Sequence, residues 1–138
     1  MDTIAEQLRA KGVRPTPIRI TVLHLLTQSP RAYTHADLER TFGHALDRVS
    51  LYRCLFTLLE AGLIQKLIDS KGACSYFYEA VQSAGNQPHF KCSQCEAVVS
   101  LPELPEAYLN AVRTYRINTI QILAEGTCED CHMKPPVP

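Results

Sequence analysis

Two Cys-x-x-Cys pairs, Cys92/Cys95 and Cys128/Cys131, constrain the fold of this 138-residue chain more than any other feature. Two such pairs that close on each other supply four thiolates in a tetrahedron, the usual coordination of structural zinc. Strand-like residues follow the first pair (97–99) and precede the second (120–123), so strand pairing could bring the two pairs together. The spacing therefore predicts a four-cysteine Zn²⁺ site.

Disulfide bonds, or a redox-active pair, are the competing interpretations of these cysteines. The first thirteen residues, MDTIAEQLRAKGV, contain no apolar run of the signal-peptide kind, which predicts a cytoplasmic protein with reduced thiols. No stretch of the chain has the apolar length of a membrane span. Four thiolates also leave no open coordination position for a reactive water, so the pattern argues against a zinc enzyme.

The chain is predicted to divide at residues 81–88, VQSAGNQP, where small and turn-forming residues interrupt the hydrophobic pattern. We interpret this segment as a hinge between residues 1–80 and 89–138. Before it, apolar residues recur at helical spacing in three stretches. The stripes are Ile18, Val22, Leu25 and Leu26; Leu38, Phe42, Ala45 and Leu46; and Leu51, Leu55, Leu58 and Leu59.

The ends of these helices carry their own signals. Thr16 followed by Pro17 is typical of an N-cap with proline in the first turn, and Thr34 with Asp37 is typical of a capping box. Gly62 is placed to end the third helix. The pattern then becomes extended over 63–68 and 75–79, which predicts a hairpin.

Helices followed by a two-stranded hairpin describe a winged helix-turn-helix, whose last helix enters the DNA major groove. Fourteen basic residues balance fourteen acidic ones in the whole chain, and residues 1–82 hold ten Lys and Arg against eight Asp and Glu. Charge alone therefore does not indicate whether the chain binds DNA. If the leucines of the third helix face inward, Ser50, Arg53 and Thr57 lie opposite. Arg53 could bond guanine and Tyr52 could pack on a thymine methyl. A solvated helix face is the alternative.

Residues 89–138 predict strands at 89–92 and 97–101, a helix, and a strand at 117–123. About fifty residues bury little surface, so zinc and a partner subunit are both expected to stabilise this part. The alternative is a monomer whose helix folds back on its own sheet. The predicted fold class is α+β, with a winged helix-turn-helix followed by a small α/β dimerisation domain. The apolar face of its helix consists of Leu104, Tyr108, Ala111, Val112 and Tyr115.

Several segments resemble the ferric uptake regulator (Fur) family, and the resemblance covers nearly the whole chain. They are RPTPIRITVL at 14–23, THADL at 34–38, RVSLYRCLFTLLEAGLI at 48–64, YE at 78–79 and HFKCSQC at 89–95. The resemblance implies a metal-responsive transcription regulator, usually a repressor, that binds an A/T-rich operator as a homodimer. A zinc uptake regulator-like or atypical member would fit the departures described below.

The resemblance also implies which residues contact DNA. Tyr52 and Arg53 match the family's major-groove pair, and Arg14 matches a basic residue that enters an A/T-rich minor groove, where the negative potential is enhanced. Arg19 matches a further family position. Ser50 stands where the family usually has threonine and keeps the hydroxyl.

A second, regulatory metal site matches the family less completely, because this chain lacks the histidine-rich run that the family carries before the first cysteine pair. Glu79 and His89 match family ligands, and His35 and Asp69 are nearby substitutes, as are Cys74 and Glu103. Such ligands suit zinc, iron or manganese. Two alternatives stay open: a Fur-like regulator that has lost metal sensing, and a zinc-ribbon adaptor that binds protein rather than DNA.

Overall fold

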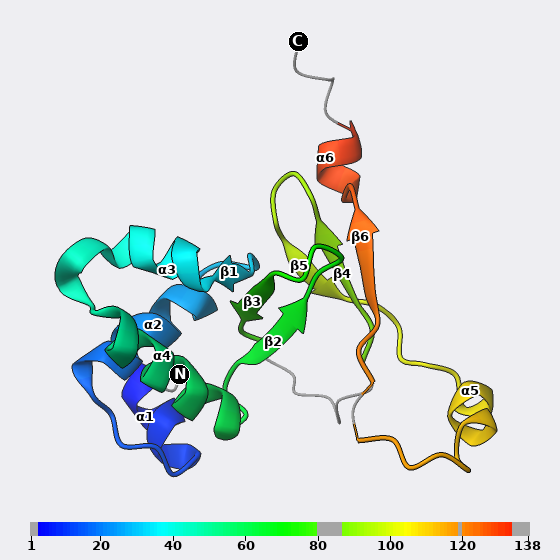
Figure 1. Cartoon of the computed structure of the whole chain (residues 1–138), viewed down its shortest axis with the longest axis horizontal. Helices are drawn as coiled ribbons and strands as arrows, with labels where there is room; N and C mark the ends of the chain where they lie inside the picture. The colour runs from blue at the N-terminus through cyan, green and yellow to red at the C-terminus, as the bar shows by residue number, and fades with distance from the viewer. Residues whose placement is uncertain (1–2, 80–86, 119, 134–138) are drawn as a thin grey trace. The chain divides into compact units, whose positions relative to one another are not determined.

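The computed structural model describes residues 3–79, 87–118 and 120–133, and it leaves out the side chain of His44. Most of the predicted hinge, residues 81–86, lies outside the described residues. The chain forms two compact units, and the boundary between them in the sequence follows residue 80 (Figure 1). None of the described helices is both long and apolar enough to cross a lipid bilayer.

The N-terminal unit contains a bundle of short helices with a small sheet (Figure 1). The three predicted helices are present, preceded by a shorter one, and the third predicted stripe lies on the longest. A single 3₁₀ turn follows the second predicted helix, so Ala45 and Leu46 fall beyond its end. The elements are α1 (Ile4–Ala10), α2 (Pro17–Thr27), α3 (His35–Phe42), η1 (Gly43–Ala45) and α4 (Arg48–Glu60).

Side-chain oxygens fix the helix starts, as the sequence predicted at two of them. Thr16 caps α2 by accepting a hydrogen bond from the Arg19 backbone N–H, and Pro17 occupies the first turn. Thr34 and Asp37 form a reciprocal capping box, with both bonds 3.0 Å long. Such caps satisfy backbone donors that the helix itself cannot, so they set where each helix begins.

The core of the N-terminal unit is built from the inward faces of these helices and from the sheet. Leu51, Leu55 and Leu58 of α4 are buried, which confirms the predicted orientation of that helix for three of its four leucines, and Leu59 is half-buried. Gly62 has a φ of 74° and ends α4, where the Leu63 N–H bonds the Leu58 carbonyl. Further fully buried members are Leu8, Val22, Leu23, Leu26 and Leu38.

The wing is an antiparallel hairpin of β2 (Gln65–Ile68) and β3 (Cys74–Phe77), and a third strand completes its sheet in the order β1-β3-β2. The added strand, β1 (Tyr33–Thr34), pairs with β3 and leads directly into α3. Two residues are too few to show a strand periodicity, so the sequence did not predict it. The pairing ties the start of α3 to the wing.

The C-terminal unit contains a second three-stranded sheet, in the order β5-β4-β6. The central strand β4 (His89–Cys92) pairs antiparallel with β5 (Val98–Ser100) and parallel with β6 (Leu123–Gly126). Two short helices, α5 (Glu106–Ala111) and α6 (Glu129–Met133), accompany the sheet, and α5 buries none of its residues.

Two sequence predictions for this unit were wrong in position. The strand expected at 117–123 begins only at Leu123, because parallel pairing places Cys92 opposite Gly126 and so carries β6 up to the second cysteine pair. Gly126 lies against the Phe90 ring, where a Cβ atom would meet a ring carbon at 3.5 Å. The helix expected to reach Tyr115 ends at Ala111, since a start without a side-chain cap does little to extend so short a helix.

Candidate nucleic-acid interface and metal centre

The exposed face of α4 is the candidate nucleic-acid surface. Asp47 caps the helix by accepting hydrogen bonds from the Ser50 N–H and hydroxyl, both at 2.8 Å. Arg53 is exposed, and Tyr52 keeps 53% of its surface accessible. An arginine and an aromatic ring therefore stand side by side on the N-terminal half of a helix, where base-reading helices carry their contacts.

Two residues of this face were missed by the sequence analysis. Val49 and Phe56 are 56% and 64% exposed, and with Tyr52 they follow the i, i+3, i+7 spacing of one helix face. That spacing, counted away from the leucine stripe, was the signal that could have found them. Ser50 and Thr57, predicted on this face, are half-buried, and Ser50 already bonds Asp47.

A chain of side-chain contacts joins α3 to this surface. The ring of His35, the first residue of α3, stacks on Tyr52 with centroids 3.8 Å apart and planes inclined by 21°. His35 Nδ1 lies 3.1 Å from Glu39 Oε1, and the same oxygen accepts a 2.9 Å hydrogen bond from Arg48 Nε. This bond with Arg48 is the main reason that the pKa of Glu39 is lowered.

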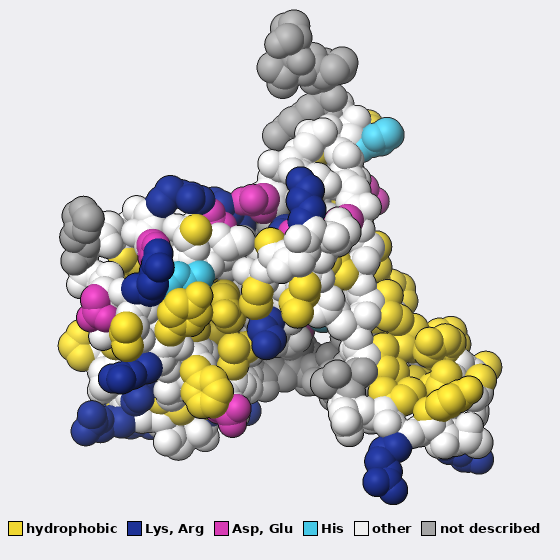
Figure 2. All heavy atoms as spheres, viewed as in Figure 1, with side chains coloured by type: hydrophobic (Ala, Val, Ile, Leu, Met, Phe, Trp, Pro, Cys, Tyr) yellow, Lys and Arg dark blue, Asp and Glu magenta, His cyan; other side chains and the backbone are white. Residues whose placement is uncertain are grey.

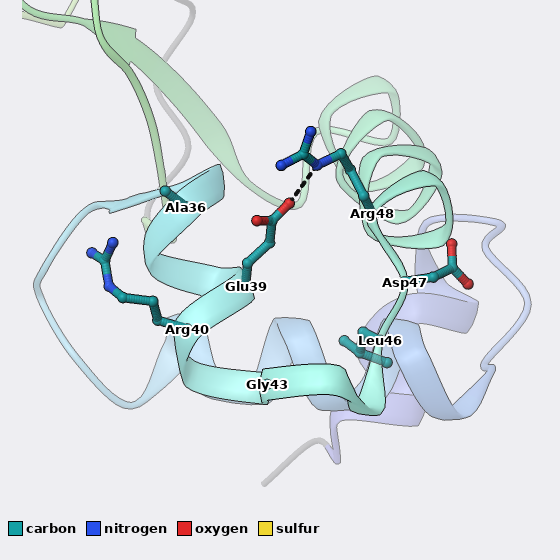
Figure 3. A pocket seen from close by; sticks show the side chains of 7 residues that line it. All are labelled: Ala36, Glu39, Arg40, Gly43, Leu46, Asp47 and Arg48. Carbon is teal, nitrogen blue, oxygen red and sulfur yellow. Dashed lines mark hydrogen bonds and ion pairs between the residues drawn. The ribbon is translucent and has the colours of Figure 1, made fainter.

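A shallow cavity of about 550 Å³ lies between α3 and the start of α4. Figure 3 shows Glu39 of α3 and Arg48 of α4 reaching toward each other at its edge, with Arg40 and Asp47 on either side. Because the bonds of Glu39 and Asp47 go to Arg48 and Ser50 respectively, these carboxylates organise the helix start.

The two basic residues predicted near the start of α2 differ in their surroundings. Arg14 is exposed, whereas Arg19 is half-buried and donates a 2.9 Å hydrogen bond from Nη1 to the Arg14 carbonyl. Arg19 thus holds the backbone of the segment that carries Arg14. Its guanidinium is committed to that segment, and Arg14 is the cation left facing solvent.

The four predicted metal ligands come together in the C-terminal unit. All four Sγ atoms of Cys92, Cys95, Cys128 and Cys131 lie within 4.8 Å of one another. The Cys95 and Cys128 sulfurs are 3.7 Å apart. A Zn–S bond of about 2.3 Å in a tetrahedron places sulfurs about 3.8 Å apart, so this spacing fits a Zn²⁺ ion. None of these thiols forms a disulfide.

Backbone donors prepare one of these thiols for metal binding. The N–H groups of Cys95, Cys128 and Gln94 approach Cys92 Sγ at 3.4 to 3.5 Å and lower the pKa of Cys92 to about 6, with Cys95 contributing most. The pKa of Cys131 is raised, chiefly through its hydrogen bond with Cys128. Crowded thiols resist joint ionisation without a cation, which is the condition that Zn²⁺ relieves.

The candidate regulatory ligands lie in both units and have local partners. In the N-terminal unit, Asp69 Oδ1 accepts from the Lys71 and Ala73 N–H groups at 2.9 Å and so shapes the wing turn. Glu79 Oε2 accepts from Gln65 Nε2 at 2.6 Å, and His35 has the contacts given above. His89 begins β4 of the C-terminal unit. Among the described residues, only the four cysteines form a metal-binding group of three or more side chains.

Comparison with known proteins places these features in a family. Residues 10–124 match the model of the ferric uptake regulator family. Over 137 aligned residues the chain is 27% identical to the transcriptional regulator FurA of Mycobacterium tuberculosis, and the match covers 92% of this chain and 88% of that protein.

Solved structures of regulators also resemble this chain. A zinc uptake regulator complexed with zinc and DNA is 27% identical, with a TM-score of 0.73 over 91% of this chain and 88% of that one. The ferric uptake regulator of Vibrio cholerae shares the fold, with a TM-score of 0.63, 17% identity, and coverage of 88% of this chain and 97% of that one.

Proposed function

The chain belongs to the ferric uptake regulator family, and we propose that it is a metal-responsive transcriptional repressor that binds an A/T-rich operator in double-stranded DNA as a homodimer. Its similarity to a zinc uptake regulator complexed with zinc and DNA makes it a zinc uptake regulator-like member. The observation that carries the proposal is the exposed Tyr52–Arg53 pair on the capped half of α4.

Each DNA contact follows from side-chain chemistry. Arg53 can donate two hydrogen bonds to guanine O6 and N7, and the free face of Tyr52 can pack on a thymine methyl. Arg14 supplies a cation for a narrow A/T-rich minor groove. We assign supporting roles to Arg19, which holds the segment of Arg14, and to Ser50, which completes the helix cap. Thr57 is half-buried and would make at most an edge contact.

The structural cofactor is zinc, held by the four cysteine thiolates. Structural zinc carries out no reaction there; it closes the two cysteine pairs and couples metal binding to folding. A cage of four thiolates has no open position for substrate, and regulators of this family are not enzymes.

The homodimer is supported by the unpaired surface of the C-terminal unit. Figure 2 shows hydrophobic side chains gathered over the α5 end of that unit. Tyr108, Tyr115 and Ile117 are all exposed, with Tyr115 71% accessible. Exposed apolar groups of this kind mark association surfaces, because a single unit leaves them in water. A second copy of the chain would cover them.

In the N-terminal unit we propose Glu79 as a ligand of an exchangeable regulatory metal, with His35 and Asp69 as the secondary candidates. In the C-terminal unit we propose His89 as a candidate ligand. Glu and His suit zinc, iron(II) or manganese(II). Asp69 is the weaker candidate of the two because it already accepts two backbone bonds. Thiols kept reduced for zinc also favour a cytoplasmic location.

Binding of the zinc-loaded protein to double-stranded DNA, titrated by fluorescence anisotropy over a salt series, tests the proposal. The probes are a duplex selected by the protein from a randomised pool and a scrambled duplex of equal composition. We expect preference for the selected duplex, a steep loss of affinity with salt, and tighter binding when zinc, iron(II) or manganese(II) is added. If the affinity for the duplex does not change when metal is added, the protein is a regulator without a metal-sensing site. No duplex binding would favour the protein-binding adaptor.

A further inference from the structure

We propose that His35 is a positioning residue that holds the Tyr52 ring in the orientation used to read DNA. The inference rests on the proposed function, because it assumes that Tyr52 contacts the duplex. It assigns a role to a histidine that the sequence suggested only as a substitute metal ligand.

Stacking restricts the Tyr52 side chain in the free protein. The two rings lie face to face at 3.8 Å and 21°, so His35 covers one face of the tyrosine. Tyr52 nevertheless remains 53% exposed, which leaves the opposite face and the ring edge accessible. A ring held in this way presents one defined apolar surface to a thymine methyl instead of sampling several rotamers.

His35 is itself held through both its backbone and its side chain. It follows the Thr34 cap as the first residue of α3, where the backbone is held by the capping box and by pairing of Thr34 with Ser75 of the wing. Its Nδ1 lies 3.1 Å from Glu39 Oε1, within ion-pair distance of that carboxylate. Glu39 in turn bonds Arg48, the first residue of α4 (Figure 3). Contacts from His35 through Glu39 to Arg48 therefore connect α3 to α4, the helix that carries Tyr52.

The rest of the imidazole supports a role through the ring face. His35 Nε2 is buried and has no hydrogen-bond partner among the described residues. A phenylalanine in its place would keep the stacking surface and remove an unsatisfied nitrogen, at the cost of the contact with Glu39. A metal ligand could not be replaced in this way, so the substitution separates the two roles.

A Tyr52 ring that is held by His35 before binding is pre-organised for contact with DNA. Immobilising a free side chain on binding lowers affinity by a factor of about 2 to 13, and a side chain already held avoids that loss. The effect of His35 should accordingly vanish when Tyr52 is removed. A double-mutant cycle measures this dependence directly.

The test uses zinc-loaded full-length protein and the duplex selected by the wild type. His35→Ala should weaken binding about 3- to 10-fold, whereas His35→Phe should stay within about twofold of wild type. In a Tyr52→Ala background, His35→Ala should add no further loss. In the free protein, His35→Ala should also shift the Tyr52 ring resonances in the NMR spectrum, since the neighbouring ring current is lost, while the melting temperature reports folding.

The possible outcomes separate this inference from the proposed function. If Tyr52→Ala weakens binding but His35→Ala does not, positioning by His35 is wrong and DNA reading by α4 stands. If His35→Ala costs as much without Tyr52 as with it, or if His35→Phe fails to restore affinity in a folded protein, His35 acts by another route and the inference is overturned. If Tyr52→Ala itself leaves affinity unchanged, the proposed DNA surface is wrong.

Discussion

The two units of this chain are stabilised by different means. The N-terminal unit buries a continuous apolar cluster contributed by α1, α2, α3, α4 and the wing, with Leu23 and Leu38 fully inaccessible. In the described part of the C-terminal unit, the buried hydrophobic side chains are Cys92, Val98 and Cys131, and two of these three belong to the sulfur cluster.

This difference implies that the two units have separate roles, DNA contact for the N-terminal unit and subunit pairing for the C-terminal unit. Apolar burial of about 25 cal/mol per Å² can hold a small helical unit without a cofactor, and the rigid result suits a surface that must present side chains to DNA. A three-stranded sheet whose helix α5 buries no residue lacks that source of stability, so we expect its fold to depend on Zn²⁺ and on a second copy. We therefore expect loss of zinc to destabilise the C-terminal unit, which pairs the subunits, before it affects the N-terminal unit.

The largest expected effect is from Cys92→Ser. Binding free energies of structural zinc are about 10–16 kcal/mol, so losing one thiolate should cost several kcal/mol, release the metal and disrupt the dimer. Zinc analysis, thermal unfolding and sedimentation measure these effects. Cys74→Ser, at the half-buried cysteine of the wing, is the matched control. Stoichiometric zinc and an unchanged melting curve in Cys92→Ser would refute the site.

Leu58→Ala should act on the other unit. It removes a fully buried side chain from the apolar cluster, which typically costs about 2–5 kcal/mol. Denaturant unfolding should show the loss while zinc content stays at the wild-type value. Leu109→Ala, at a half-buried position on α5, should change stability far less. Zinc loss in Leu58→Ala would mean that the units do not have separate sources of stability.

Arg53→Ala should separate DNA recognition from stability. We expect a loss of about 1–3 kcal/mol in binding to the selected duplex and a relaxed base preference, with no change in zinc content. Arg14→Ala should weaken binding chiefly on A/T-rich flanks. Arg113→Ala, at an exposed position in the C-terminal unit, serves as the control. Wild-type affinity of Arg53→Ala for both duplexes would contradict the assignment.

Thr34→Ala should have the smallest effect, about 0.5–2 kcal/mol, because it removes the cap of α3. Burial alone would raise the pKa of Asp37, but bonds from Thr34, aided by Arg31 and Arg40, outweigh it and lower that pKa below 3.8. A depressed folded-state pKa adds stability above the unfolded-state value, and this stability is lost as pH falls through the folded-state pKa.

Denaturant unfolding at pH 7 and at pH 3 measures this contribution. Thr34→Ala should narrow the difference in unfolding free energy between the two pH values, since Asp37 then keeps fewer of its bonds. Thr21→Ala, at an exposed position on α2, is the matched control and should leave the difference unchanged. An equal pH dependence in wild type and Thr34→Ala would show that the capping box does not set the pKa of Asp37.

How much the sequence could predict depends on whether the signal was local. The Thr16 and Thr34 caps and the Gly62 terminus act within one helical turn, so they could be read directly. Fixed Cys-x-x-Cys spacing likewise predicted the cluster that the structure brings together. Sheet register is different, because the pairing of Cys92 with Gly126 joins distant segments and moved the last strand beyond its apolar pattern.

The candidate surface shows the same limit. A leucine stripe predicts which side of α4 faces out, but it does not reveal that His35 of another helix stacks on Tyr52. Nor does composition indicate that Glu39 joins His35 to Arg48. Contacts between helices follow from packing, and a single sequence carries little trace of them.

Hydrogen exchange of the zinc-loaded protein, mapped by residue with and without the selected duplex and a chelator, tests the central claim most directly. We expect the duplex to protect the N-terminal half of α4. We expect chelation to remove protection from β4, β5 and β6 while α2 and the core of α4 keep theirs. Protection of the C-terminal sheet by DNA with none at α4, or loss of protection in both units together on chelation, would contradict it.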